Sequence, residues 1–115
     1  DGTKILITQV APQQMKMLSL STAWDITSTI SVLGVYSLAS PAPAGSSRAL
    51  AVNSNGTKYW ILNDSTKEVI QFSMSTAWDI TSSSLDSTTF GVSSQAQTPR
   101  AITFKVGGGK LFRYL

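Results

Sequence analysis

The sequence predicts an all-β protein made of tandem copies of a unit of about fifty residues, each copy holding four short strands. Three observations predict it: a segment that recurs unchanged, a composition that favours strands, and turn signals along the whole chain. The segment Ser-Thr-Ala-Trp-Asp-Ile-Thr-Ser occupies 21–28 and returns 54 residues later at 75–82. Eight consecutive matches that include a Trp are not expected by chance in 115 residues, so the repeat sets the frame for every other element.

The composition favours strands and removes several kinds of chemistry. Hydrophobic residues make up 42% of the chain and charged residues 13%, which is unlike a disordered chain. Ser and Thr are abundant, and Ile and Val occur in short runs, as in strands. The chain has no Cys and no His. It therefore lacks a disulfide framework, a thiolate metal site, the commonest general base and the commonest metal ligand, and we expect no cofactor and no metal.

The first half of each unit is a predicted hairpin. Its first strand covers 49–52, with a copy at 101–106, and Asn-Gly at 55–56 is a strong hairpin signal because both residues tolerate positive φ. The second strand covers 58–62 and has copies at 4–8 and 110–114.

The second half of each unit supplies two more strands. A polar turn at 63–66 leads to a third strand at Glu68–Met74, whose copy is Gln14–Leu20. Apolar residues alternate with other residues in this strand, which is the period of two that a strand requires. The repeated Trp segment follows, and then a fourth strand is predicted at 89–93, with its copy at 35–39.

The boundaries of the units follow from the spacing. The shift falls from 54 to 52 residues at Arg48-Ala49, which meets Arg100-Ala101, and the extra residues lie in a Pro/Gly/Ala loop at 41–45. Insertions in repeat proteins fall in loops. We therefore divide the chain into 1–54, a first repeat that lacks its first strand and runs into the second; 55–106, the second repeat; and 107–115, the start of a third.

A period of about fifty residues with four strands is typical of the four-stranded blades of a β-propeller. Another repetitive β architecture and an immunoglobulin-like sandwich remain as alternatives, although a sandwich does not predict a repeated Trp segment. Two blades cannot close a ring, since typical rings have about four to eight. The chain is then either part of a longer array or a protomer that self-associates, for example three chains giving six blades, and the extra strand at 110–114 favours the longer array.

The repeated motif has a structural interpretation and a functional one. It comprises Ser21, Thr22, Trp24, Asp25, Ser75, Thr76, Trp78 and Asp79. We expect each indole to pack where neighbouring blades meet, and the Ser, Thr and Asp residues to open a short helical turn. The alternatives are that the indoles stack on sugars and that the Asp residues are catalytic. A retaining glycosidase needs two carboxyls about 5 Å apart, and nothing in the sequence places two acids together.

Three further residues are candidates for a ligand site or an interface between blades. Arg48 and Arg100 open the first strand of each unit, where a guanidinium would bridge carbonyls of the adjacent blade or bind an anion in a central channel. Trp60 is the aromatic residue expected to be most exposed, because its strand follows a hairpin.

Charge and hydropathy exclude two classes of partner. The net charge is +3 and the basic residues are spread along the chain, so we expect no nucleic-acid stripe. No stretch approaches the roughly 20 apolar residues of a membrane span.

Three segments carry a family resemblance: Leu-Ser-Thr-Ala-Trp-Asp-Ile-Thr at 20–27, Asp-Gly-Thr-Lys at 1–4 and Thr-Pro-Arg-Ala-Ile-Thr-Phe at 98–104. They resemble tandem repeats found in tail, fibre and other virion proteins of bacteriophages and in large surface or secreted bacterial proteins, and the resemblance covers nearly the whole chain. It implies a structural or adhesive role in a virion, outside the cell or on a cell surface. The partners that it implies are neighbouring blades of the same or identical chains, other virion or cell-surface proteins, and host-surface glycans.

The resemblance names no catalytic residue. We therefore expect a non-enzymatic structural or adhesive module, with a carbohydrate-binding, lectin-like propeller as the alternative. A propeller-type hydrolase would need acids that converge on a channel. The available acids are few and lie mostly in predicted loops: Asp25, Asp64, Glu68, Asp79 and Asp86.

Overall fold

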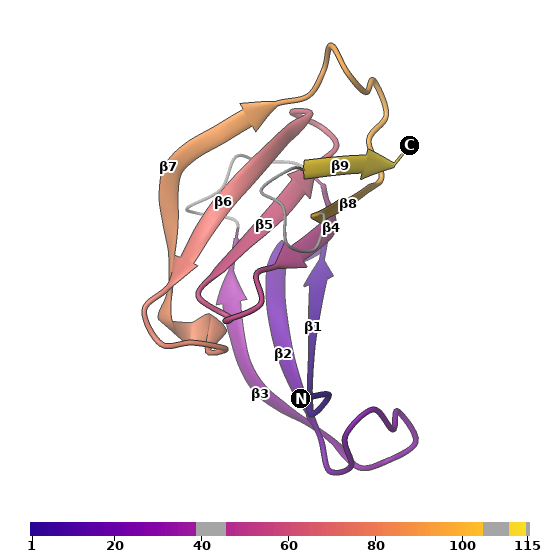
Figure 1. Cartoon of the computed structure of the whole chain (residues 1–115), viewed down its shortest axis with the longest axis vertical. Coiled ribbons are helices and arrows are strands. Elements are labelled where there is room, and N and C mark those ends of the chain that lie inside the picture. The colour runs from indigo at the N-terminus through magenta and orange to yellow at the C-terminus, as the bar shows by residue number, and fades with distance from the viewer. Residues whose placement is uncertain (39–45, 105–110, 115) are drawn as a thin grey trace.

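The computed structural model describes residues 1–38, 46–104 and 111–114, the last four by their backbone alone. The described residues form antiparallel strands and one short 3-10 turn, η1 (Ile80–Ser82), in three sheets (Figure 1). The first sheet contains β1 (Lys4–Gln9), β2 (Gln14–Leu20) and β3 (Ile30–Ser37). The second contains β4 (Ser47–Val52), β5 (Lys58–Asn63), β6 (Glu68–Met74) and β7 (Ser83–Gly91). The third contains β8 (Ala101–Phe104) and β9 (Leu111–Tyr114).

Neighbouring sheets repeat strand pairings through equivalent residues: the first and second sheets share the pairing of the second strand with the third, and the second and third sheets share that of the first strand with the second. Examples are Lys4–Ser19 and Lys58–Ser73 in the first two sheets, and Ala49–Leu62 and Ala101–Tyr114 in the second and third. The pairing of the third strand with the fourth repeats only up to a bulge, beyond which Leu18 pairs with Val32 while its counterpart Phe72 pairs with Leu85. The repeat in the sequence is therefore a repeat of backbone pairing, in which the first sheet holds the second, third and fourth strands of a unit and the third sheet holds a first and a second strand.

The third strand of each unit has the predicted bounds, but the fourth strand is longer than predicted. β3 begins five residues before its predicted start at 35, and β7 begins six residues before its predicted start at 89. β3 ends at Ser37 and β7 at Gly91, before the predicted ends at 39 and 93. Residue 39 lies outside the described residues. The added residues include the run Ser-Ser-Leu-Asp-Ser-Thr at 83–88, which has no regular apolar alternation. Pairing with β6, which starts at Met74↔Ser83, makes this segment a strand despite its polar composition.

The first strand of each unit has the predicted location. β4 begins two residues earlier than predicted, and β8 covers 101–104, while the predicted continuation to 106 lies outside the described residues. The division of the sequence at 54/55 placed β4 at the end of the first unit. In the structure β4 pairs with β5 and belongs to the second sheet, and β8 in the same way belongs to the third sheet.

Two apolar cores lie on opposite faces of the second sheet. The first core joins it to the first sheet, and its buried members are Met15, Met17, Leu38, Tyr59, Ile61, Ile70, Phe72, Met74 and Ile80. In this core the ring of Phe72 stacks on Tyr59, with ring centroids 4.9 Å apart, and meets Tyr36 of the first sheet edge-on. The second core contains Leu62, Val69, Val92 and Ile102 and joins the second sheet to β8.

The second sheet therefore contributes apolar residues to a core on each of its faces, as a unit inside a stacked array must do. Within the described ranges the sheets stay open, and the first sheet ends at β1 on one side and at β3 on the other. Among the described residues no further strand pairs with the outer edge of β1 or of β3 (Figure 1).

Candidate functional site

Trp24 and Trp78 occupy equivalent places in the two complete copies of the repeated motif. Both residues have positive φ, 63° and 62°. The backbone N–H of Trp24 donates to the carbonyl of Gly2 at 2.8 Å, and that of Trp78 donates to Gly56 at 2.9 Å. The motif therefore ties itself to the preceding hairpin turn of its own unit in the same way each time.

A glycine lies beneath each indole. A Cβ built on Gly2 would come 2.3 Å from the ring of Trp24, and one built on Gly56 would come 2.4 Å from the ring of Trp78. Each tryptophan follows its glycine by 22 residues, and this constant spacing is the signal in the sequence that could have revealed the contact. The recurring Trp therefore packs on the hairpin turn of its own unit, a role that the sequence analysis missed.

The predicted helical turn is formed differently from the expectation. In the second copy Asp79 caps η1 by accepting from the N–H of Thr81, so the acid reaches forward along the chain. In the first copy Asp25 accepts from the N–H and hydroxyl of Thr27, at 2.9 and 2.6 Å, although this copy contains only a turn. The hydroxyl of Thr27 and then its N–H hold the pKa of Asp25 below its usual value.

The serines and threonines that open the motif do not cap it. The Ser21 hydroxyl accepts from the N–H of Thr29 across the loop, and the N–H groups of Thr22 and Thr76 donate to the hydroxyls of Ser28 and Ser82. For Ser75 the bond is made by the backbone, whose N–H donates to the carbonyl of Ser82. The prediction that the first Ser and Thr cap the turn is wrong, because the serine that ends each motif, Ser28 or Ser82, lies inside the loop. Its hydroxyl accepts from the N–H of Thr22 or Thr76.

The two tryptophans differ in exposure, and a hollow of about 450 Å³ lies between them. Trp24 is 82% exposed, whereas Trp78 is half-buried beside the first sheet, where the ammonium of Lys4 donates to its carbonyl at 3.4 Å. The lining residues come from both units: Asp1, Gly2, Lys4, Trp24, Ser54 and Trp78. The prediction that each indole is buried between units therefore does not hold for Trp24 within the described part of the chain, where its side chain lies on the outer side of the first sheet and stays exposed.

Arg48 and Arg100 converge on one carboxylate. Arg48 Nε lies 2.7 Å from Asp64 Oδ2, and Arg100 Nη1 lies 3.4 Å from the same oxygen. Arg100 precedes the third sheet, so this carboxylate links successive units, in place of the carbonyls or channel anion expected from the sequence. The hydrogen bond from Arg48 is the main cause that lowers the pKa of Asp64.

Trp60 is not the exposed aromatic residue that the sequence suggested. It is half-buried, its ring lies 4.3 Å from that of Phe104, and its Nε1–H donates to Gln71 Oε1 at 3.0 Å. The second core takes up Trp60 because β8 covers this face of the second sheet. Trp60 thus belongs to the interface between units, where it also lines a shallow hollow with Phe90 and Phe104.

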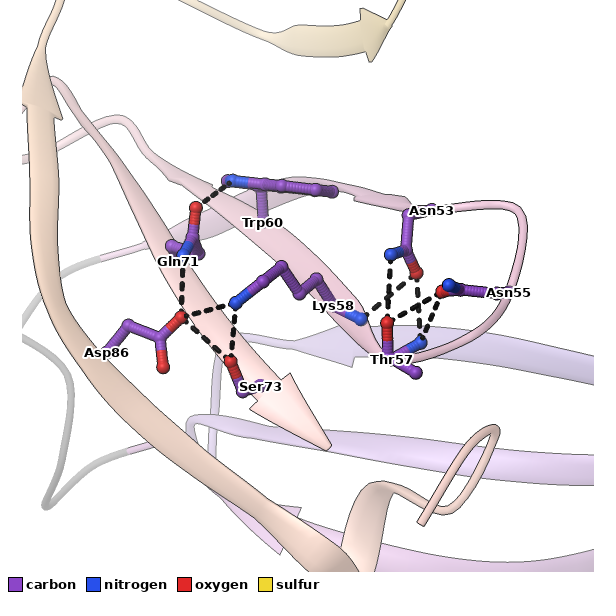
Figure 2. Close-up of polar contacts among 8 residues, drawn as sticks. All are labelled: Asn53, Asn55, Thr57, Lys58, Trp60, Gln71, Ser73 and Asp86. Atoms are coloured by element: carbon purple, nitrogen blue, oxygen red, sulfur yellow. Dashed lines mark hydrogen bonds and ion pairs between the residues drawn. The ribbon is translucent and has the colours of Figure 1, made fainter. Parts of the chain in front are cut away.

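A polar cluster around Asp86 was also missed (Figure 2). Its Oδ2 accepts from Gln71 Nε2 at 2.6 Å and from Ser73 Oγ at 2.8 Å, and it lies 3.2 Å from Lys58 Nζ. Hydrogen bonding from Gln71 is the main cause that holds the pKa of Asp86 below its usual value. No repeat signal marks this residue, because its counterpart in the first unit is Val32.

The cluster places a lysine and a serine in contact around one carboxylate. Lys58 Nζ donates to Ser73 Oγ at 2.8 Å while Ser73 donates to Asp86. The Asp86 carboxylate thus accepts from the serine hydroxyl and is paired with the lysine. The geometry supports a link between β5, β6 and β7.

Other functional groups are limited within the described part of the chain. No group of three or more His, Cys, Asp or Glu residues among 1–38, 46–104 and 111–114 could hold a metal ion. No helix in those ranges is long and apolar enough to cross a membrane. Comparison with models of protein families, with curated proteins and with solved structures finds no match to the chain.

Proposed function

We propose that the chain is a run of blades from a β-propeller that serves as a non-enzymatic structural or adhesive module. The observation that carries the proposal is the recurrence of equivalent strand pairings from the first sheet to the second and from the second to the third, with an apolar core on each face of the middle sheet. A sheet that buries both faces against neighbours of its own kind is the building unit of a radial array.

The non-enzymatic part of the proposal rests on how the acids are used. Asp64 and Asp86 are committed to ion pairs, and Asp25 and Asp79 hold the turns that carry the tryptophans. The proposed place in a virion or on a cell surface rests on the likeness of 20–27 to repeats of bacteriophage and bacterial surface proteins.

A designed protein of joined copies of 47–100, four to eight in number as in typical propellers, tests the architecture. Negative-stain electron microscopy is expected to show closed rings with a central channel. Rods or open spirals of stacked sheets would contradict a propeller and favour a solenoid. Immunogold labelling of purified particles and of cell fractions tests the location, since label confined to the cytosol would exclude a virion or surface role.

Carbohydrate binding is the second candidate, because the hollow between Trp24 and Trp78 combines indole surface with Asp1 and Lys4. Aromatic faces and a few polar groups are the usual means of holding a small polar ligand. A glycan array followed by titration of tryptophan fluorescence tests this function. Trp24→Ala is expected to abolish binding, and Ile26→Ala, a change at a similarly exposed residue outside the lining, is expected to preserve it.

A further inference from the structure

The hairpin turn between β4 and β5 carries an asparagine whose side chain is exposed and whose next residue is glycine. This residue is Asn55, and it lies at the tip of the turn (Figure 2). The other asparagines of the chain differ in both respects. Asn53 is half-buried and precedes a serine, and Asn63 is fully buried and precedes an aspartate. Asn55 is therefore the asparagine whose amide group is open to reaction.

An asparagine that precedes glycine is prone to lose its amide group without an enzyme. The backbone nitrogen of the glycine bonds to the side-chain carbonyl carbon, the bond to the side-chain nitrogen breaks, and ammonia leaves with the proton that the backbone nitrogen gives up through solvent. Water then opens the cyclic imide at one of its two carbonyls and yields aspartate or isoaspartate. Glycine favours ring closure because it has no side chain to hinder the approach and its backbone is the most mobile.

The folded turn holds the attacking nitrogen in place. The N–H of Gly56 donates to the carbonyl of Asn53 at 3.1 Å, and the carbonyl of Gly56 accepts from the N–H of Trp78 at 2.9 Å. Gly56 is buried although it lies in a hairpin turn, because the indole of Trp78 packs on it. The nitrogen is released for ring closure only when these contacts open.

The side chain of Asn55 is held by the same turn. Its Oδ1 accepts from the N–H of Thr57 at 3.2 Å and from the hydroxyl of Thr57 at 2.6 Å (Figure 2). Both groups that would react are therefore fixed by hydrogen bonds of the closed turn.

The first repeat shows that one product of the reaction fits this turn. Asp1 occupies the place of Asn55, and its Oδ1 accepts from the N–H and the hydroxyl of Thr3 at 3.0 and 2.7 Å. An aspartate at position 55 would thus make the same two bonds. Isoaspartate adds one carbon to the main chain, so it would displace Gly56 from beneath Trp78.

We propose that Asn55 is a site of spontaneous deamidation and that the packing of Trp78 on Gly56 sets the rate. The reaction is slow while the indole covers the glycine and proceeds when the turn opens. Conversion to aspartate adds one negative charge and keeps the turn, whereas conversion to isoaspartate opens it. All of these contacts lie within one unit, so the inference does not depend on how the units are arranged.

The first test compares the folded chain with the chain unfolded in guanidinium chloride, both at mildly alkaline pH. Peptide mapping by mass spectrometry, with enzymatic methylation of isoaspartate, measures the conversion of Asn55. The folded chain is expected to react at least about tenfold more slowly, because opening a packed turn costs more than the about 1.4 kcal/mol that a factor of ten represents. Equal rates in the two states, or no conversion of Asn55 in the unfolded chain, would overturn the proposal.

The second test removes the indole. Trp78→Ala is expected to speed the conversion of Asn55 by about tenfold or more, because the loss of a packed aromatic ring usually costs more than that factor represents. Trp24→Ala is the matched control, since it makes the same change in the first repeat and leaves Trp78 on Gly56. Its rate is expected to equal that of the wild type. Circular dichroism checks that both variants are folded, and equal rates in two folded variants would contradict a role for Trp78.

Hydrogen exchange of the Gly56 amide tests the same opening in the wild-type chain, and it decides the question if Trp78→Ala does not fold. The N–H must leave its partner both for exchange and for ring closure. Exchange followed by NMR is therefore expected to be slowed, relative to the unfolded chain, by a factor similar to the slowing of deamidation. Protection of the Gly56 amide without protection of Asn55, or the reverse, would overturn the proposal.

Discussion

The ring of Trp78 lies on the backbone of Gly56, so close that a Cβ on the glycine would come within 2.4 Å of the indole. Gly56 also has φ +70°, a conformation that L-residues rarely adopt. The hairpin turn and the Trp segment therefore form one packed structural unit, and Gly2 and Trp24 make the same contact in the first repeat.

Gly56→Ala is expected to lower the free energy of unfolding by more than about 1–2 kcal/mol, which is the cost of the left-handed conformation alone. The added methyl group also displaces the Trp78 indole. Urea unfolding followed by tryptophan fluorescence measures the change. Gly91→Ala is the matched control, because a Cβ there meets nothing within 4 Å. Equal losses in the two variants would show that neither the left-handed conformation of Gly56 nor its contact with the indole contributes to stability.

Phe72→Ala is expected to cost about 3–5 kcal/mol, the usual range for removing a buried aromatic ring. Phe72 is fully buried between Tyr59 and Tyr36, and its loss opens a cavity where the first and second sheets meet. Thermal unfolding by circular dichroism is the measurement. Phe90→Ala changes a ring that is 51% exposed and is expected to cost far less. A similar cost at both positions would contradict a core shared by the two sheets.

Acidification is expected to destabilise the chain through Asp86. Its hydrogen bonds from Gln71 and Ser73, and its pairing with Lys58, place its pKa in the folded chain below the unfolded value of about 3.9. The stabilisation is therefore present above about pH 4 and is lost as the pH falls through the folded pKa, because the unfolded chain takes up the proton first. Asp86→Asn is expected to cost about 1 kcal/mol or less at pH 7, as partly exposed pairs do.

The test is the difference in unfolding free energy between the wild type and Asp86→Asn at several pH values. This difference should narrow steadily below about pH 4. A difference that stays constant down to pH 2 would mean that the carboxylate contributes through its shape and not through its charge.

Tyr59→Phe is expected to leave stability unchanged or to raise it slightly. The hydroxyls of Tyr59 and Ser83 are buried beside each other, but the contact between them falls short of hydrogen-bond geometry, and neither bonds to another described residue. Burial also raises the pKa of the Tyr59 hydroxyl, so it stays neutral and its loss removes no charge. Removing a buried hydroxyl that has no partner removes its desolvation cost, and the stack on Phe72 is kept. A loss above about 1 kcal/mol in chemical denaturation would show that this hydroxyl has a partner.

Local sequence patterns predicted much of the backbone. The bounds of β2 and β6 follow from alternation, which reports directly which side of a strand is buried. The long polar starts of β3 and β7 could not be predicted in this way, because Ser and Thr runs are compatible with loops. Their pairing depends on β2 and β6 lying beside them, and local composition does not contain that information.

The residues of the candidate site show the same distinction between contacts within one segment and contacts from distant strands. Repetition marked Trp24, Asp25, Trp78 and Asp79 as structural, since a motif copied with its turn must meet the same local contacts each time. Trp60 and Asp86 were misjudged or missed because their surroundings come from strands distant in sequence: Phe104 covers the indole of Trp60, and Lys58 and Gln71 bind the carboxylate of Asp86.

The sequence by itself determined the repeat and the pairing partners within each hairpin, because these depend on side-chain alternation and backbone preference over a few residues. Only the tertiary structure decided which faces are covered. It buried Trp60 and left Trp24 and the outer face of the first sheet exposed, although Trp24 and Trp78 share one motif. The physical reason is that burial depends on a neighbouring sheet being present, and a residue's own segment does not specify that neighbour.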